Sequence, residues 1–168
     1  MLTKYSMTSE TMNRVGKLLI KKNLSIAFAE SATAGRLTSD FSMIENAGKF
    51  LKGGIACYDA CVKEGLLGVD PKLIAQFTPE SMEVTRAISF GIASVIPADI
   101  HIGITGLTCP GGSETEEKPV GTMFIYAIRD SNLIFSERLN FTGSRWEIVS
   151  HTVDCFAELL EDYLKSIK

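Results

Sequence analysis

The amino-acid sequence predicts an α/β fold: a mixed sheet of about five strands, mostly parallel with a late antiparallel hairpin, covered by helices on both faces. Strand-like apolar runs alternate with segments of helical spacing, which is typical of parallel βαβ units. Near the C-terminus, two strand-like runs over residues 122–128 and 133–139 are separated only by turn-forming residues, so they predict the hairpin. The 168 residues, 45% hydrophobic and 22% charged, fit one globular domain over residues 1–168.

The first third of the chain predicts a helix, a strand and a second helix. A helix is expected over residues 8–22, where apolar residues recur at helical spacing and Thr8 or Ser9 supplies the N-cap. A short buried strand is expected over residues 24–29, and the second helix over residues 34–44.

Three short elements are expected next. They are a strand over residues 54–58, a helical piece over residues 61–67 and a short helix over residues 71–77. Gly53-Gly54 is expected to form a turn before the strand, because glycine pairs commonly punctuate strands. Gly68 is expected to end the helical piece.

A longer helix is expected after Thr78. Threonine is a favoured N-cap, and Pro79 suits the first helical position because its fixed φ is already helical. The helix is expected to run to about Val95, and Pro97 stops it. The apolar run over residues 100–105 is expected to be a strand buried on both faces.

The C-terminal third contains the hairpin and a final helix. Residues 113–118 are polar and acidic, so we expect a mobile loop before the hairpin. Ser144 followed by Glu147 forms a capping box, which predicts the start of a helix. One continuous apolar face then predicts that this helix extends over residues 145–167.

Composition excludes several functional classes. Seventeen basic and 20 acidic residues give a net charge of −3 without any basic run, so nucleic-acid binding is not expected. No apolar window approaches the roughly 20 residues that span a bilayer, so no membrane association is expected. The polar residues 1–10 do not resemble a secretory signal, and we expect a cytoplasmic protein.

The cysteines and histidines do not predict a metal site. The chain contains four cysteines and two histidines, and no C-x-x-C pair. We expect the cysteines to be reduced thiols that act as small apolar side chains. These residues are Cys57, Cys61, Cys109, Cys155, His101 and His151.

Two turns of small residues, each directly after a strand-like run, are the first candidates for chemistry. In residues 30–35, backbone N–H groups at the start of a helix favour an anion or a developing oxyanion. Ser31 in this turn could be a nucleophile, or it could simply cap the helix. The glycine-rich residues 106–112 match no named nucleotide motif, and they could approach a phosphate or form a tight loop without a ligand.

Three further side chains are candidates for the same site. Lys63 could act as a base if burial or a nearby cation lowers its pKa, or it could be an ordinary surface lysine. Tyr58 could orient a substrate or relay a proton, or it could only pack. Arg145 opposes the helix dipole in the first turn of the last helix, and its guanidinium could clamp a phosphate. His151 has no evident acidic partner, so a Ser–His–Asp triad is not expected.

Taken together, these segments resemble the C-terminal domain of the CinA family of competence/damage-inducible proteins. The matching segments occur in order over nearly the whole chain. They are residues 29–35, 53–58 with Lys63, 66–69, 104–106 with 110–112, 118–122, and Phe141 with Gly143 and Arg145.

The resemblance implies a three-layer α/β/α fold and an amidohydrolase. Active members of the family are nicotinamide-nucleotide amidases, which convert nicotinamide mononucleotide to nicotinic acid mononucleotide and ammonia without a metal or another cofactor. The implied catalytic residues are Ser31 as nucleophile, Lys63 as its activating base, and Tyr58. The implied substrate-binding residues are Glu30, Ala32, Thr33, Gly35, Thr105, Gly106, Gly111, Gly112 and Arg145. We also expect a homo-oligomer, since sheet folds of this size often pair.

The chain departs from the family pattern in its ligand loops. Ala32 stands where a cysteine is usual and Ala34 where a glycine is usual, and an alanine resists positive φ. Residues 46–48 replace Pro-Gly-Ser, and Thr108-Cys109 replaces Ala-Gly. The alternative function is therefore a catalytically inactive relative that binds pyridine nucleotides or a protein partner.

Overall fold

The computed structural model describes residues 9–168, which form a five-stranded sheet flanked by helices. In chain order the elements are α1 (Glu10–Lys21), β1 (Ile26–Glu30), α2 (Arg36–Ser42), the 3₁₀ turn η1 (Ala47–Lys49), β2 (Leu51–Ala56), α3 (Ala60–Leu67), α4 (Pro71–Phe77), α5 (Met82–Val95), β3 (Ile100–Gly106), β4 (Thr122–Arg129), β5 (Asn132–Asn140) and α6 (Arg145–Ser166).

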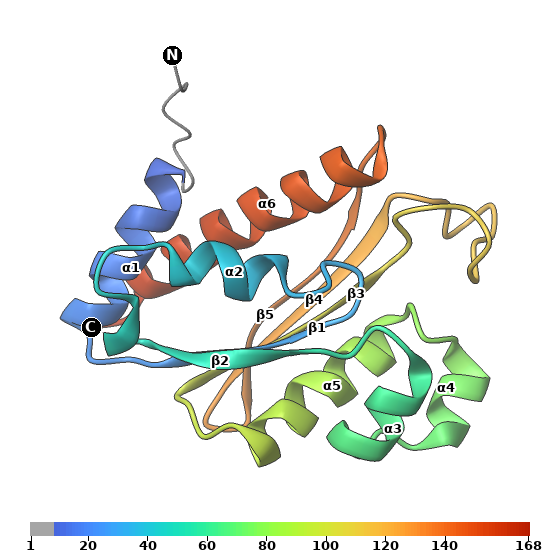
Figure 1. Ribbon diagram of the computed structural model, residues 1–168, viewed down its shortest axis with the longest axis horizontal. Helices are drawn as coiled ribbons and strands as arrows, with labels where there is room; N and C mark the ends of the chain where they lie inside the picture. Colours follow the sequence, from blue (N-terminus) through green and yellow to red (C-terminus); the bar gives the residue numbers. More distant parts are fainter. Residues whose placement is uncertain (1–8) are drawn as a thin grey trace.

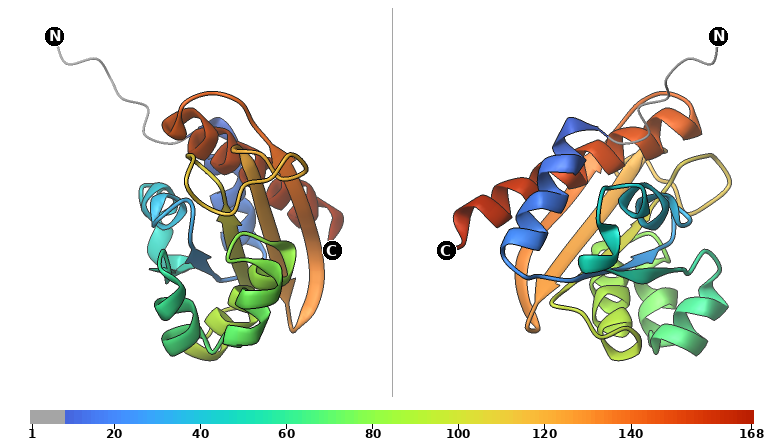
Figure 2. Two further views of the ribbon diagram at one scale, coloured as in Figure 1. Left: turned by 90° about the vertical axis from the view of Figure 1, so that its right-hand side faces the viewer. Right: turned by 60° about the vertical axis from the view of Figure 1, so that its left-hand side comes forward.

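The strand order is β2-β1-β3-β4-β5. β1 pairs in parallel with β2 and β3, whereas β3–β4 and β4–β5 are antiparallel. The predicted mixed sheet with a late hairpin is therefore confirmed. α1, α2 and α6 cover one face of the sheet, and α3, α4 and α5 cover the other (Figures 1 and 2).

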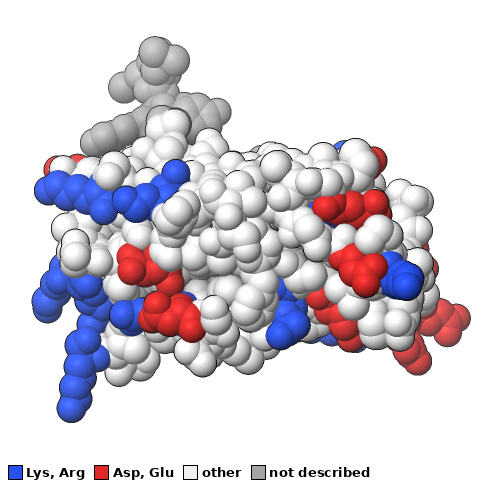
Figure 3. All heavy atoms as spheres, turned by 90° about the horizontal axis from the view of Figure 1, so that it is seen from below, with Lys and Arg blue, Asp and Glu red and all other residues white. Residues whose placement is uncertain are grey.

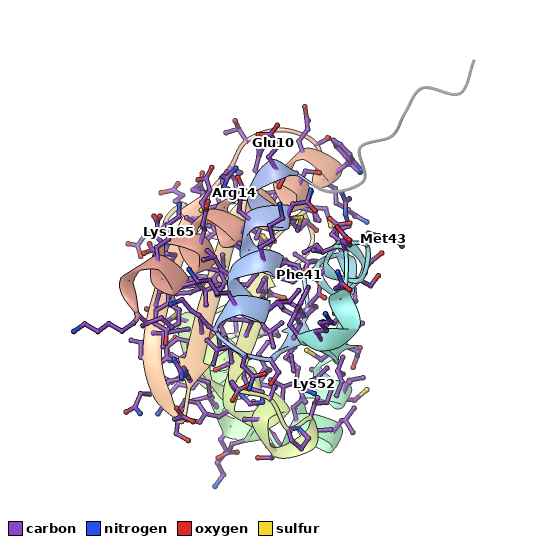
Figure 4. The ribbon with its side chains drawn as sticks, turned by 90° about the vertical axis from the view of Figure 1, so that its left-hand side faces the viewer. Glu10, Arg14, Phe41, Met43, Lys52 and Lys165 are labelled. Atoms are coloured by element: carbon purple, nitrogen blue, oxygen red, sulfur yellow. The ribbon has the colours of Figure 1, made fainter. Side chains whose placement is uncertain are left out.

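The central strands supply both cores because successive strand side chains point to opposite faces. In β1, Phe28 joins the core under α1, α2 and α6, where it lies 5.0 Å from Phe41 and 5.8 Å from Phe156 between ring centroids. Phe41 points from α2 into this layer (Figure 4). Ala27 and Ala29 face the second core, under α3 to α5. β3 is buried along almost its whole length, as predicted.

Most predicted elements are confirmed, with differences only at their ends. Ser9 is the N-cap of α1 and accepts a hydrogen bond from the Met12 N–H, whereas Thr8 lies outside the described residues. Gly68 ends α3 in the left-handed conformation. The capping box of Ser144 and Glu147 opens α6.

The predicted Gly53-Gly54 turn is wrong, because both glycines lie inside β2. A Cβ atom on Gly54 would lie 2.0 Å from the Thr38 hydroxyl oxygen and 3.2 Å from the Phe28 carbonyl oxygen. Glycine is therefore needed here for the close packing of α2 on the sheet and not for a turn.

The predicted start of α5 is also wrong. Ser81 is its N-cap and accepts a hydrogen bond from the Val84 N–H. Thr78 instead ends α4 with φ +69°, and its hydroxyl accepts a hydrogen bond from the Lys118 ammonium at 2.6 Å. Lys118 also donates to the Glu80 carbonyl, and the Ser113 hydroxyl bonds to Thr78 and Glu80, so the loop expected to be mobile is attached at both its ends to the α4–α5 connection.

The surface carries charges of both signs. On the face seen in Figure 3, basic side chains gather mainly at one end and acidic ones mainly at the other, separated by a largely uncharged surface. Within residues 9–168, no helix combines the length and the apolar character needed to cross a membrane.

Candidate active site

The candidate site lies where the parallel strands β2, β1 and β3 end, which is where open α/β sheets place their ligands. The turn over residues 31–35 follows β1, and the loop over residues 107–121, which includes most of the glycine-rich residues 106–112, follows β3. The first turn of α6 lies at the same end of the molecule (Figure 1).

Glu30, at the end of β1, organises the turn. Its carboxyl group is fully buried and accepts five hydrogen bonds. One oxygen accepts from the Thr33 hydroxyl and from the N–H groups of Gly35 and Leu37, at 2.7–3.1 Å. The other accepts from the N–H and the hydroxyl of Thr38, at 2.8 and 2.7 Å. Glu30 therefore positions the turn from beneath and does not line the cleft.

Ser31 directly follows β1 and is almost fully buried. Its N–H donates to the Ile104 carbonyl of β3 at 2.9 Å. Its hydroxyl has no hydrogen-bond partner within residues 9–168, and the N–H groups of Ala32 and Thr33 have none there either. The turn therefore offers one hydroxyl and two free backbone donors within three consecutive residues.

This turn forms one wall of a cleft of about 380 Å³. Ala32 and Thr33 form this wall of the cleft. Tyr58 and Thr108 line the cleft from the loops after β2 and β3, and Arg145 lines it from α6. The other lining residues are Ala34, Arg36, Trp146 and Val149. The volume and the mixture of apolar, aromatic and cationic groups suit a small charged ligand.

A smaller hollow of about 150 Å³ adjoins the cleft at Tyr58 and Thr108. It is lined by the loop over residues 106–112 and by Glu80. The N–H groups of Gly111 and Gly112 donate to the Glu114 carboxylate at 2.7 and 2.8 Å. These bonds hold the pKa of Glu114 below its ordinary value.

Lys63 is a buried lysine on α3. Its ammonium donates to the carbonyl groups of Cys57 and Tyr58, at 2.8 and 3.1 Å. Burial lowers its pKa, because the charged form loses its hydration. Burial also raises the pKa of the Cys57 thiol beside it. No hydrogen bond joins Lys63 to Ser31 within the described part of the chain.

The predicted site residues fall into three groups. Ala32, Thr33, Tyr58 and Arg145 line the cleft, whereas Gly106, Gly111 and Gly112 line the smaller hollow. The third group is not among the lining residues of either space and consists of Glu30, Ser31, Gly35, Lys63 and Thr105, of which all but the partly buried Gly35 are buried. Thr105 is fully buried, and its hydroxyl lies 2.7 Å from that of Thr85.

Sequence reasoning missed Arg36 and Trp146. The Arg36 guanidinium carbon lies 5.9 Å from the centroid of the Trp146 ring, and both side chains line the cleft. The signal that singled out Arg145, a basic residue in the first turn of a helix, also applies to Arg36. Within residues 9–168, no group of three His, Cys, Asp or Glu side chains could hold a metal ion.

The architecture and the site define an α/β protein with a ligand-sized cleft at the carboxyl ends of its parallel strands. A family model described as the CinA C-terminal domain matches residues 8–164. The chain belongs to this family.

The relatives extend this result. A CinA-like protein of Desulfotalea psychrophila is 32% identical over 161 residues, covering 95% of this chain and 38% of the relative. A CinA-like protein of Thermotoga maritima is 33% identical over 162 residues, covering 96% and 39% respectively. The chain therefore spans less than two fifths of the length of these relatives.

Solved structures agree with the fold over the whole domain. The crystal structure of a CinA superfamily protein from Klebsiella pneumoniae matches with a TM-score of 0.88 and 26% identity, covering 94% of this chain and 98% of that one. A CinA superfamily protein from Enterobacter cloacae matches with a TM-score of 0.85 and 27% identity, covering 92% and 90%. The predicted family and the three-layer fold are confirmed.

Proposed function

We propose that this protein is an amidohydrolase that converts nicotinamide mononucleotide to nicotinic acid mononucleotide and ammonia. One observation carries the proposal: the turn with a free Ser31 hydroxyl and free N–H groups at Ala32 and Thr33 borders the same cleft as Arg145. The nucleophile and the two oxyanion donors serve the hydrolysis itself, and the cation serves to bind the phosphate of the substrate.

In the proposed reaction, Lys63 removes the Ser31 proton while Oγ attacks the carboxamide carbon. The oxyanion accepts hydrogen bonds from the Ala32 and Thr33 N–H groups. The proton passes to the amide nitrogen, the C–N bond breaks, and ammonia leaves an acyl-serine ester. Water then attacks the ester, which releases the carboxylic acid and returns the proton to Ser31.

The surroundings of Lys63 support its role as the base. A neutral amine has two N–H donors and one lone pair. The carbonyl groups of Cys57 and Tyr58 accept both donors, which leaves the lone pair available to a serine hydroxyl. Burial lowers the pKa of Lys63 and so increases the fraction of neutral amine.

One observation favours the alternative, an inactive relative that binds pyridine nucleotides. Lys63 donates only to backbone carbonyl groups within the described residues, which is also what a structural lysine does. In that case the cleft would bind the nucleotide without turning it over. The cytoplasmic location and the homo-oligomer remain predictions.

Ammonia release from nicotinamide mononucleotide tests the proposal. We expect turnover in the unsubstituted protein and its loss in Ser31→Ala, while calorimetry still shows nucleotide binding. Ser39→Ala, which removes an exposed hydroxyl from α2, is the matched control and should retain activity. Binding without turnover in the unsubstituted protein would favour the inactive relative, and turnover by Ser31→Ala would refute the nucleophile.

A further inference from the structure

Two guanidinium groups from separate helices line the cleft. Arg36 is the first residue of α2 and Arg145 the first residue of α6. A cation in the first turn opposes the partial positive charge of the helix N-terminus, so the helix dipole explains neither position. The N–H groups of Leu37 and Thr38 in α2 are occupied by Glu30, so they are not available to a ligand.

The positive charges of the two arginines are only partly neutralised by acidic side chains in the described part of the protein. Arg145 has no hydrogen bond or ion pair within residues 9–168, and the carboxylate of Glu147 is bound to Ser144. Arg36 binds Asp40 through Nε at 2.7 Å, and its two Nη groups have no partner in the described part of the chain. Two cations and one carboxylate leave this part of the cleft positively charged.

The geometry of Arg36 is fixed from two sides. Asp40 holds Nε, while the guanidinium lies over the Trp146 indole at 5.9 Å. This cation–π contact leaves the outer edge of the guanidinium, formed by its two Nη groups, available for two parallel hydrogen bonds. That edge matches two oxygens of a phosphate group.

The glycine-rich loop is the other candidate site for an anion, but two of its N–H groups already donate to a carboxylate of the protein. The Glu114 carboxylate takes the N–H groups of Gly111 and Gly112, and Glu80 adds a second carboxylate to the same hollow. A phosphate in this hollow would have to displace Glu114 and approach Glu80. The charges therefore direct a phosphate to the arginines.

We infer that Arg36 is a phosphate ligand that makes the cleft specific for mononucleotides, and that Trp146 is its positioning residue. This inference rests on the proposed function and adds a specificity-determining residue: Arg36 selects a pyridine ring that carries a phosphomonoester over the nucleoside or the free base. Arg36 and Arg145 together hold the phosphate, while the carboxamide lies at the turn that contains Ser31.

Calorimetry with nicotinamide mononucleotide and nicotinamide riboside tests the inference, in a Ser31→Ala background that prevents turnover. We expect the mononucleotide to bind more tightly than the riboside. Arg36→Gln should weaken mononucleotide binding by about 10-fold or more and leave riboside binding unchanged. Unchanged riboside binding also shows that the variant is folded. Arg86→Gln, which removes an exposed guanidinium on α5, is the matched control and should keep the preference.

The role of Trp146 has its own readout. Trp146→Ala should reduce the preference for the mononucleotide, whereas Trp146→Phe should restore most of it because a phenyl ring still supports the guanidinium. Equal binding of the two compounds by the Ser31→Ala protein, no binding of either, or an unchanged preference in Arg36→Gln would overturn the inference. Absence of ammonia release with the preference intact would refute only the proposed function.

Discussion

Glu30 and Thr38 are joined by two hydrogen bonds, one from the Thr38 N–H at 2.8 Å and one from its hydroxyl at 2.7 Å, both to the same carboxyl oxygen. This pair connects the end of β1 to α2 and so holds the turn between them. The shape of the cleft wall therefore depends on a buried carboxyl group that does not itself line the cleft.

Glu30→Gln should destabilise the protein. The amide nitrogen of glutamine cannot accept the hydrogen bonds that the carboxyl oxygen accepted, so two or three buried donors lose their partner. We expect the free energy of unfolding in urea to fall by about 2–3 kcal/mol. Glu158→Gln, on the exposed side of α6, should change it little, and an equal effect of the two substitutions would contradict the role of Glu30.

Gly54→Ala should disturb the same connection from the β2 side. The added Cβ atom would lie 2.0 Å from the Thr38 hydroxyl oxygen, which Glu30 holds in place. We expect a loss of roughly 2 kcal/mol in unfolding free energy, because overpacking in a close contact costs about 1–3 kcal/mol. At Gly48 a Cβ atom meets nothing within 4 Å, so Gly48→Ala should be nearly neutral.

Ala34→Gly should stabilise the protein, contrary to the usual effect of adding glycine. Ala34 has φ +49°, a left-handed conformation that costs a residue with a Cβ atom about 1–2 kcal/mol. Part of the gain is offset by the greater flexibility of the unfolded chain, so we expect a net gain of about 0.5 kcal/mol in thermal or urea unfolding. Ala75→Gly, in the exposed part of α4, should have the opposite sign.

Lys63→Arg should separate the structural role of this residue from its chemical one. Arginine can still donate to the Cys57 and Tyr58 carbonyl groups, but it stays protonated and cannot act as a base. We expect kcat/KM to fall about 100-fold or more. In the unsubstituted protein, kcat/KM should rise with pH through an apparent pKa below the ordinary 10.5 of lysine. Full activity of the arginine variant would exclude Lys63 as the base.

Glu161 should make stability depend on pH. It binds Arg14 of α1 at 2.7 Å and Lys165 at 2.8 Å, and these bonds lower its pKa to about 2 (Figure 4 shows Arg14 and Lys165). Because the folded-state pKa lies below the ordinary 4.5, ionised Glu161 stabilises the fold above about pH 4.5, and this contribution is lost as pH falls towards 2.

The stability difference between the unsubstituted protein and Glu161→Gln should therefore be largest near neutral pH and should shrink from about pH 4.5 downwards. Thermal melts over this range measure it. Asp162→Asn, at the exposed neighbouring position, serves as the control and should leave the pH dependence unchanged. A difference that is constant with pH would show that Glu161 does not titrate in this way.

Local patterns were sufficient for most of the fold. Apolar spacing defines α1 and α6, a continuous apolar run defines β3, and the capping box of Ser144 and Glu147 marks the start of α6. These signals act between residues close together in the chain, so they are readable without the structure. The matched motifs also pointed to the family, which the comparisons confirm.

By itself, then, the sequence determined the order and type of the elements, the mixed sheet and the family. Only the tertiary structure decided that Gly54 belongs to a strand under Thr38, that Thr78 ends a helix and binds Lys118, and that Arg36 shares a cleft with Arg145. The reason is physical: each of these outcomes depends on a contact between residues far apart in the chain, and no local preference specifies such a contact.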